Sequence, residues 1–366
     1  MIRFLFILWL SCPLHVFTQV TSTLLHDGLS RTFVYYLPSN WAVGDNVPLM
    51  ILLHGLTQTG AGVMDITQFN QIAEQEKFII VYPDGNNFAW NANMNVSISS
   101  ADDLGFIENL AGYFQNNFGT DPQRQYLVGF SNGGFMSHKI ACESSMCFAA
   151  IATVSGNMSD TTFNNCSPVY NTSVLHLHGT SDAIVPYNGG TATGVSVTQT
   201  MEKWQSFLTC DPIPVSSAMP NPNLIDLSSP TLLTYQNCTS DLKHIRIDGG
   251  GHQWPGIQTV LGGAGIINFD FYSPDYIWSF LNGKSCPSNM LSEEELLLKV
   301  LPNPAQNFLI IESDRILAVE LFDLTGKRLL KGNSSEQISL SDLYSGIYLL
   351  NLSDGCKTKN IKIVKE

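Results

Sequence analysis

The first candidate for a catalytic residue is a serine that lies between an apolar run and a helical pattern. Ser131 is the central residue of a G-x-S-x-G motif at 129–133, between the apolar run 126–129 and a helical pattern at 132–143. Glycine on both sides of a serine permits a tight strand-to-helix turn that exposes the hydroxyl above a sheet. Because a serine hydroxyl is a weak nucleophile at neutral pH, the motif predicts a base nearby.

An acid and a histidine follow Ser131 in the order expected of a catalytic triad on a parallel sheet. Asp182 and His252 each come shortly after an apolar run, at 174–177 and 244–247. Asp182 would hold the tautomer of His252, and His252 would take the serine proton and later return it. A turn or helix cap is the alternative for Asp182, and an ordinary loop position is the alternative for His252.

Three other histidines compete with His252 for the role of base. His54 precedes Ser131 in the chain, and His176 and His178 lie in or at the end of a predicted strand. All three fit the expected order less well than His252, which follows a run of glycines.

Backbone N–H groups near the serine are candidates for stabilising a substrate oxyanion. Asn132 directly follows the serine, and Leu56 and Thr57 lie in the loop after the apolar run 48–53. We predict Asn132 N–H as one donor and Leu56 or Thr57 N–H as the other. The His-Gly pair at 54–55 also suits a plain tight turn.

Candidates for substrate contacts are Trp254, Trp90 and His54. Trp254 lies two residues after the candidate base, and Trp90 follows the stretch Tyr-Pro-Asp-Gly at 82–85. Either indole could line an acyl pocket. Plain packing in the core is the alternative for each tryptophan.

Alternation of strands and helices must position these residues. Short apolar runs predict strands, and longer periodic segments predict helices. The pattern favours an α/β fold with a mostly parallel sheet and helices on both faces, in which ligands bind at the carboxyl ends of the strands. The predicted strands are 32–37, 48–53, 78–82, 126–129, 149–154, 174–177, 231–235 and 244–247, and the predicted helices are 64–76, 101–117, 132–143 and 196–209.

Composition narrows the classes of partner. The 366 residues are 44% hydrophobic and 13% charged, with a formal net charge of -13. That balance suits a folded core, and the negative charge disfavours nucleic acid and anionic lipid as partners.

An export signal is predicted at 1–18, because Arg3 precedes the apolar run Phe4–Leu10 and small residues precede Gln19. The alternatives to an export signal are a buried strand and lipid attachment at Cys12. No later apolar run has the length of a membrane span.

Cysteine usage agrees with an oxidising compartment. Eight cysteines are present. The six from Cys142 to Cys286 allow 15 pairings, among which sequence does not choose. Because no CxxC pair or His/Cys cluster has metal spacing, we predict no metal site, and the expected chemistry needs no cofactor. These six are Cys142, Cys147, Cys166, Cys210, Cys238 and Cys286.

The last part of the chain has a different pattern. The main domain is predicted to span 19–284 and a linker 285–298, which carries the acidic stretch Ser292–Glu295. Residues 299–366 show short alternating segments broken by turns, which predicts a small all-β, sandwich-like domain.

Several motifs of the main domain occur together in one known family. Residues 25–284 resemble the polyhydroxybutyrate depolymerase and feruloyl esterase family of exported ester hydrolases, which implies the α/β-hydrolase fold. The resemblance implies the triad of Ser131, Asp182 and His252 and a disulfide between Cys210 and Cys238. The shared motifs are Leu-His-Gly at 53–55, Tyr-Pro-Asp-Gly at 82–85, Asp-Asp-Leu-Gly-Phe at 102–106, Gly-Phe-Ser-Asn-Gly-Gly at 129–134, His-Gly-Thr-Ser-Asp at 178–182 with Val-Pro-Tyr at 185–187, and Gly-Gly-His-Gln-Trp-Pro-Gly at 250–256.

One position departs from that family. Cys147 stands where members more often carry a charged residue, so the pairing among Cys142, Cys147 and Cys166 stays open.

Residues 299–366 resemble the sorting domain of the type nine (Por) secretion system. The shared motifs are Leu-Pro-Asn-Pro-Ala at 301–305, Leu-Phe-Asp-Leu-Thr-Gly-Lys at 321–327 and Leu-Tyr-Ser-Gly-Ile-Tyr at 343–348. The resemblance implies contact with secretion machinery and passage across an outer membrane to a secreted or cell-surface location. A substrate-binding β-sandwich is the alternative.

Taken together, these features predict hydrolysis of a carboxylic ester through an acyl-Ser131 intermediate. The expected substrates are feruloyl or acetyl esters on plant polysaccharide, or a short hydroxyalkanoate ester. A secreted serine peptidase and a non-catalytic carbohydrate-binding protein are the alternatives, because one fold serves several functions.

Overall fold

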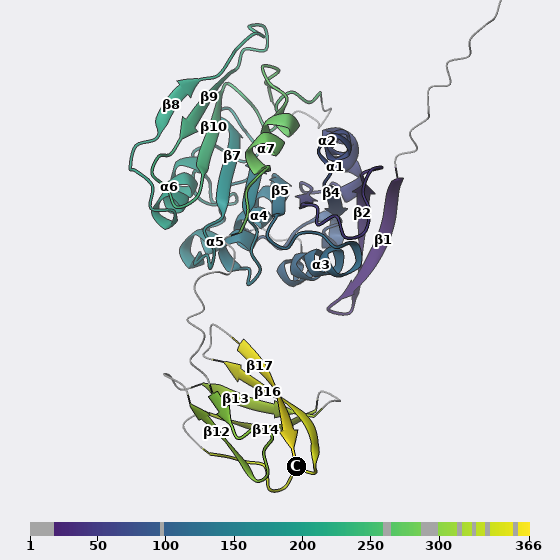
Figure 1. Cartoon of the computed structure of the whole chain (residues 1–366). Helices are drawn as coiled ribbons and strands as arrows, with labels where there is room; N and C mark the ends of the chain where they lie inside the picture. The colour runs from purple at the N-terminus through teal and green to yellow at the C-terminus, as the bar shows by residue number, and fades with distance from the viewer. Residues whose placement is uncertain are drawn as a thin grey trace, which may run out of the picture. The chain divides into compact units, whose positions relative to one another are not determined.

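The chain forms two compact units, one ending at Cys286 and the other covering the rest (Figure 1). The computed structural model describes residues 18–95, 99–258, 265–286, 299–312, 317–323, 327–333, 337–353 and 358–366. The predicted export signal and linker therefore lie almost wholly outside the described residues. None of the helices in the described part of the chain has the length and apolar character that a membrane span needs.

A ten-stranded sheet forms the first unit, in the order β1-β2-β4-β3-β5-β6-β7-β10-β9-β8. The six central strands, from β4 to β10, run parallel, and two antiparallel strands flank them at each edge. The strands are β1 (Thr18–His26), β2 (Leu29–Leu37), β3 (Leu49–Leu53), β4 (Ile79–Pro83), β5 (Gln125–Phe130), β6 (Ala150–Val154), β7 (Ser173–Gly179), β8 (Val215–Ala218), β9 (Ser229–Thr234) and β10 (Leu242–Asp248).

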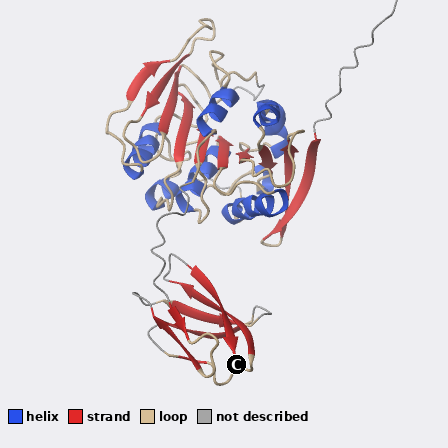
Figure 2. Ribbon diagram, viewed as in Figure 1, coloured by secondary structure: helices blue, strands red, loops and turns tan. Residues whose placement is uncertain are grey.

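Helices cover both faces of this sheet (Figure 2), so every residue of β3 to β7 is buried. Side chains alternate between two apolar clusters along each strand: Ile51 packs with one set of helices and Leu52 with the other. The first set includes α3 (Asp103–Phe118), α4 (Asn132–Glu143) and α6 (Val197–Phe207); the second includes α1 (Gly60–Thr67), α2 (Phe69–Glu76) and α7 (Ser273–Leu281). The predicted α/β fold is confirmed.

Some elements differ from the prediction. The helix expected at 64–76 is two helices. Gln68 ends α1, because it has a left-handed φ of 53° and its N–H donates to Met64 O. Strands β1 and β8 and helices α5 (Asp160–Asn165) and α7 were not predicted. Residues of β8 are all exposed, so that strand lacks the apolar pattern from which a buried strand is predicted.

Three disulfides cross-link the first unit. Cys210 pairs with Cys238, as the family resemblance implied. Cys142 pairs with Cys166, and Cys147 pairs with Cys286 across 139 residues. The last bond holds the end of the unit against the helix-to-strand connection before β6.

The second unit is a small all-β domain, as predicted. A three-stranded sheet and a four-stranded sheet enclose one apolar cluster. Their strands alternate buried and exposed residues, as Phe308–Glu312 shows. The strands are β11 (Lys299–Leu301), β12 (Phe308–Glu312) and β15 (Ile338–Ser339), and β13 (Ala318–Phe322), β14 (Arg328–Asn333), β16 (Gly346–Ser353) and β17 (Thr358–Lys365).

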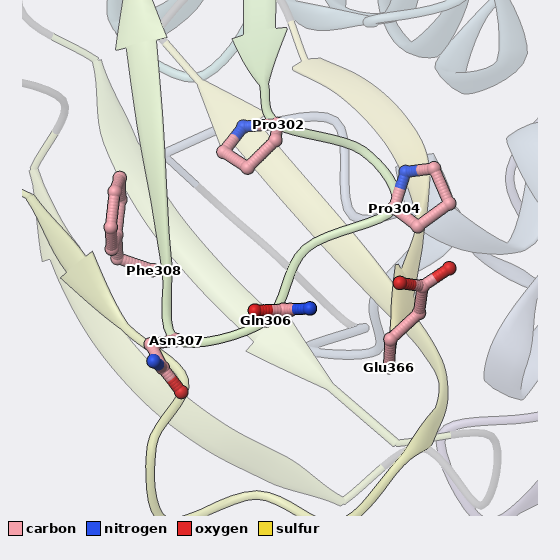
Figure 3. Close-up of a pocket in the computed structure, with 6 residues that line it drawn as sticks. All are labelled: Pro302, Pro304, Gln306, Asn307, Phe308 and Glu366. Atoms are coloured by element: carbon pink, nitrogen blue, oxygen red, sulfur yellow. The ribbon is translucent and has the colours of Figure 1, made fainter.

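The chain end is tied into this domain. The side chain of Asn303 donates to Lys362 O and accepts from Val364 N–H, and Glu366 N–H donates to Ala305 O. A pocket of about 330 Å³ lies beside this junction (Figure 3). Its lining residues are Pro302, Pro304, Gln306, Asn307, Phe308 and Glu366.

Candidate active site

Ser131 lies at the turn between β5 and α4, as the motif predicts. Its φ of 52° and ψ of -120° are unusual for a residue with a side chain. The backbone is held there by hydrogen bonds from Ser131 N–H to Val154 O at 2.9 Å and from Phe135 N–H to Ser131 O at 3.1 Å. The serine is therefore a strained residue at the start of a helix, a position that favours developing negative charge.

The flanking glycines are required by close backbone packing. A Cβ on Gly129 would lie 2.1 Å from Gly133 O, and one on Gly133 would lie 2.2 Å from Leu53 O. Any side chain at either position would force β5, α4 or β3 to move. The spacing of the motif thus follows from the steric demands of the turn.

Asp182 and His252 are brought together by two neighbouring strand ends. Asp182 follows β7 and His252 follows β10, which are parallel neighbours. Thr180 N–H donates to Ile247 O, and Ser181 N–H donates to Gly250 O, both at 2.9 Å. Across this junction, His252 Nδ1 lies 2.8 Å from Asp182 Oδ2.

The Asp182 carboxylate is buried and fully used as an acceptor. Its Oδ1 accepts from the N–H groups of Ile184 at 2.9 Å and Val185 at 2.8 Å. Burial alone would raise the pKa of Asp182, but the His178 and His252 rings beside it lower that pKa well below its usual range. The carboxylate therefore stays ionised and orients His252 through Nδ1–H.

The His252 ring also packs against the strand that ends at the serine. Its centroid lies 4.9 Å from that of Phe130, the residue before Ser131. Within the described residues there is no hydrogen bond from Ser131 Oγ to the His252 ring. Such bonds are often long in ligand-free enzymes and shorten when substrate binds.

Of the predicted oxyanion donors, Leu56 and Thr57 differ in whether the backbone N–H is already hydrogen-bonded. Thr57 N–H donates to Phe88 O at 2.9 Å, so it is already used. Leu56 N–H has no hydrogen-bond partner among the described residues, and the Leu56 side chain is 43% exposed. Asn132 begins α4, and its side chain bonds both backbone polar groups of Trp90 at 2.7 and 3.2 Å.

Trp90, Trp254 and His54 lie in the core around the site. Their exposures are 1%, 1% and 0%. Trp90 Nε1 donates to His54 O at 2.9 Å, Gly85 N–H donates to His54 Nε2 at 2.9 Å, and Trp254 stacks on Phe130. These contacts hold the Leu56 loop in place, and direct contact with substrate stays a prediction that would require the rings to be uncovered.

One neighbour of the predicted triad was considered from the sequence only as a competing base. His178 Nε2 lies 3.4 Å from Asp182 Oδ2, on the buried side of the carboxylate. The spacing of four residues between His178 and Asp182 is the signal that points to this contact. No group of three or more His, Cys, Asp or Glu side chains is arranged to hold a metal ion in the part of the chain that the structure describes.

Comparison with known proteins identifies the class. The putative esterase family matches residues 28–261, and the secretion system C-terminal sorting domain matches residues 299–366. The chain therefore belongs to the putative esterase family and carries a C-terminal sorting domain. Both resemblances drawn from the sequence are confirmed.

Particular relatives are similar at low identity. A bifunctional acetylxylan esterase/xylanase of Neocallimastix patriciarum is 26% identical over 62% of this chain and 31% of its own length. A probable feruloyl esterase C of Aspergillus clavatus is 23% identical over 68% of this chain and 82% of its own. A poly(3-hydroxyalkanoate) depolymerase C of Paucimonas lemoignei is 29% identical over 40% of this chain and 36% of its own. The chain thus spans about a third of the length of two of these proteins.

Solved structures share the fold. An acetyl xylan esterase from Aspergillus awamori covers 72% of this chain with a TM-score of 0.52 and 16% identity, and the match spans 98% of that protein. A thermostable esterase covers 73% of this chain and 63% of its own length, with a TM-score of 0.51 and 13% identity. At these identities the likeness describes the fold of the first unit alone.

Proposed function

We propose that this chain is an exported serine esterase that cleaves feruloyl or acetyl esters on plant polysaccharide. The observation that carries the proposal is the Asp182–His252 pair, joined at 2.8 Å beside the strained Ser131 turn. An ionised, buried carboxylate and a neutral imidazole are the partners that a serine needs to act as a nucleophile.

Each step has a residue assigned to it. Ser131 Oγ attacks the ester carbonyl carbon while His252 Nε2 takes the hydroxyl proton. The C–O bond to the alcohol then breaks, His252 gives its proton to the leaving oxygen, and the acyl group stays on Ser131. Water, deprotonated by His252, attacks the acyl carbon, the bond from that carbon to Ser131 Oγ breaks, and His252 returns the proton to Ser131 Oγ as the acid is released. Asp182 stays ionised and stabilises the His252 cation.

Two backbone donors would stabilise the oxyanion. Asn132 N–H lies at the first turn of α4, and Leu56 N–H, in the loop after β3, has no hydrogen-bond partner among the described residues. Hydrogen bonds from preorganised N–H groups are worth most on the charged intermediate. Because Thr57 N–H is bonded to Phe88 O, we favour Leu56 over Thr57.

Substrate class is inferred from the relatives. Proteins named for acetylxylan and feruloyl esters are among them, which supports a plant cell-wall ester. A polyester substrate is the second candidate, because a poly(3-hydroxyalkanoate) depolymerase is also similar. The sorting domain and the three disulfides support action outside the cytoplasm, at the cell surface or beyond it.

The test uses the full chain on p-nitrophenyl acetate and butyrate, methyl ferulate, acetylated xylan and a hydroxybutyrate oligomer. Ser131→Ala is measured alongside Ser216→Ala, a control on the exposed strand β8. Nucleophile removal costs on the order of a million-fold in a well-studied serine hydrolase. More than about a thousandth of wild-type activity in Ser131→Ala would exclude the serine as nucleophile.

Selectivity decides the substrate. Turnover of methyl ferulate or acetylated xylan supports the cell-wall proposal, and turnover of the oligomer alone moves the assignment to polyester. If the folded protein cleaves none of these esters but cleaves a peptide amide, the peptidase is favoured. If it binds xylan and cleaves none of them, the binding protein is favoured.

A further inference from the structure

A row of buried polar side chains leads through the core to Asp182. Trp204 on α6, His138 on α4, Thr153 on β6, and His176 and His178 on β7 are each no more than 1% exposed. Buried polar atoms must find their partners within the protein. In this row each one does so with the next.

Every link lies within hydrogen-bonding distance. Trp204 Nε1 is 3.1 Å from His138 Nδ1, and His138 Nε2 is 3.4 Å from Thr153 Oγ1. Thr153 Oγ1 is 2.7 Å from His176 Nδ1, and His176 Nε2 is 3.1 Å from His178 Nδ1. His178 Nε2 then lies 2.8 Å from Val185 O and 3.4 Å from Asp182 Oδ2.

The first group in the row fixes the tautomer of His138. Trp204 Nε1–H can only donate, so His138 Nδ1 accepts and its proton is on Nε2. Thr153 Oγ1 can then accept from His138 and has its own hydroxyl proton available for His176 Nδ1.

The last group sets the direction of the remaining bonds. Val185 O can only accept, so His178 donates from Nε2, and its Nδ1 accepts when the ring carries that proton alone. The bond from His176 then runs toward His178, and a His176 that donates through Nε2 accepts the Thr153 hydroxyl proton at Nδ1. Burial lowers the pKa of His138 to about 3 and that of His176 well below its usual range, which keeps both rings neutral.

We infer that these side chains form a one-way hydrogen-bond chain whose final donor, His178 Nε2–H, is shared between Val185 O at 2.8 Å and Asp182 Oδ2 at 3.4 Å and so holds the Asp182 carboxylate in position. His178 is then a positioning residue for the proposed triad, and this inference rests on the proposed function. Bonds aligned in one direction polarise one another, which strengthens the donor at the end. Asp182 thus has two backbone donors on Oδ1 and two imidazoles at Oδ2.

The first test reads the proton positions and needs no activity. The full chain is labelled with ¹⁵N-histidine, and NMR at neutral pH distinguishes protonated from bare ring nitrogens. We expect Nε2–H in His138, His176 and His178. Three other rings serve as internal controls with Nδ1–H: His54 and His244, whose Nδ1 atoms face carbonyl oxygens, and His252, whose Nδ1 faces Asp182. A proton on Nδ1 of His176 or His178 would overturn the chain.

The second test separates donation from packing at His178. In His178→Gln, the amide nitrogen can lie near the place of Nε2 and still donate to Asp182. In His178→Asn, the shorter amide reaches only the place of Nδ1. We expect kcat to fall about 10- to 100-fold in His178→Asn with KM within about twofold, because a bond to a charged group is lost. His178→Gln is expected to stay within about fivefold of wild type.

The outcomes distinguish the two proposals. Wild-type kcat in a folded His178→Asn refutes the positioning role. Equal losses in both variants, with equal losses of thermal stability, would make His178 a packing residue only. Ser131→Ala tests the proposed function and leaves the proton positions unchanged, so its failure is separate from a failure of the chain.

Discussion

The two units of this chain are both built around sheets, but they bury different kinds of side chain. In the unit that ends at Cys286, the core holds histidines, Asp182 and Asp103 beside its apolar residues. In the described part of the C-terminal unit, the buried side chains are apolar or aromatic. Buried polar groups are costly unless paired, so their concentration in one unit marks where chemistry has required them.

The buried carboxylates of the first unit have partners. Arg31 and Asp103, both buried, are joined at 2.6 Å, and Asp182 accepts from two backbone N–H groups and His252. The second unit instead has an apolar core between two sheets, and the hydrogen bonds that join Asn303 to β17 lie at the surface. Four experiments would test this difference between the two units.

The largest effect is expected from Asp182→Asn. An amide at this position can donate to His252 and so favours the wrong tautomer, which costs about 10⁴-fold in kcat. Turnover of p-nitrophenyl acetate measures it, with Asp241→Asn as the exposed control. A loss below tenfold would remove Asp182 from the triad.

Acid is expected to unfold the first unit selectively. Burial lowers the pKa of His138 and His244 from 6.5 to about 3. Between these values the unfolded chain binds protons that the folded chain does not, so stability is lost as pH falls below 6.5. Each histidine contributes roughly 1 to 2 kcal/mol per pH unit.

Tryptophan fluorescence measures this transition, because all six tryptophans precede Cys286. The last histidine is His252, so the C-terminal unit is expected to keep its strand signal in circular dichroism. Unchanged tryptophan emission down to pH 4 would contradict the buried neutral histidines.

Removing the long-range disulfide is expected to destabilise the first unit by about 2 to 5 kcal/mol. Cys147 and Cys286 are replaced together by serine, and the matched control replaces Cys210 and Cys238. The bonds close 139 and 28 residues, so the control should cost about 1.4 kcal/mol less in the chain-entropy description. Denaturant titration followed by tryptophan fluorescence compares them, and an equal or larger loss in the control would argue against loop entropy as the cause.

The smallest effect is expected from ending the chain after Cys286. If all of the catalytic machinery lies in the first unit, kcat on a soluble ester should stay within about twofold of the full chain, since no assigned residue is removed. Export by a host with the matching secretion system should be lost. A fall of more than tenfold in kcat would show that the C-terminal unit contributes to the site.

Sequence patterns predicted the parts of this molecule that depend on local interactions. The parallel strands follow from continuous apolar runs, and the glycines at 129 and 133 follow from a turn that tolerates no Cβ. The order of Ser131, Asp182 and His252 along the chain is likewise visible without coordinates. Each of these signals is carried by residues a few positions apart, where sterics and burial act directly.

Only the tertiary structure decided the contacts between distant residues. The pairing of Cys147 with Cys286, the use of Thr57 N–H by Phe88 and the burial of Trp90 depend on how loops meet in space. The same holds for the row from Trp204 to Asp182, whose members come from four different elements and the loop after β7. A hydrogen bond depends on distance and direction, and spacing along the chain does not encode either across a sheet.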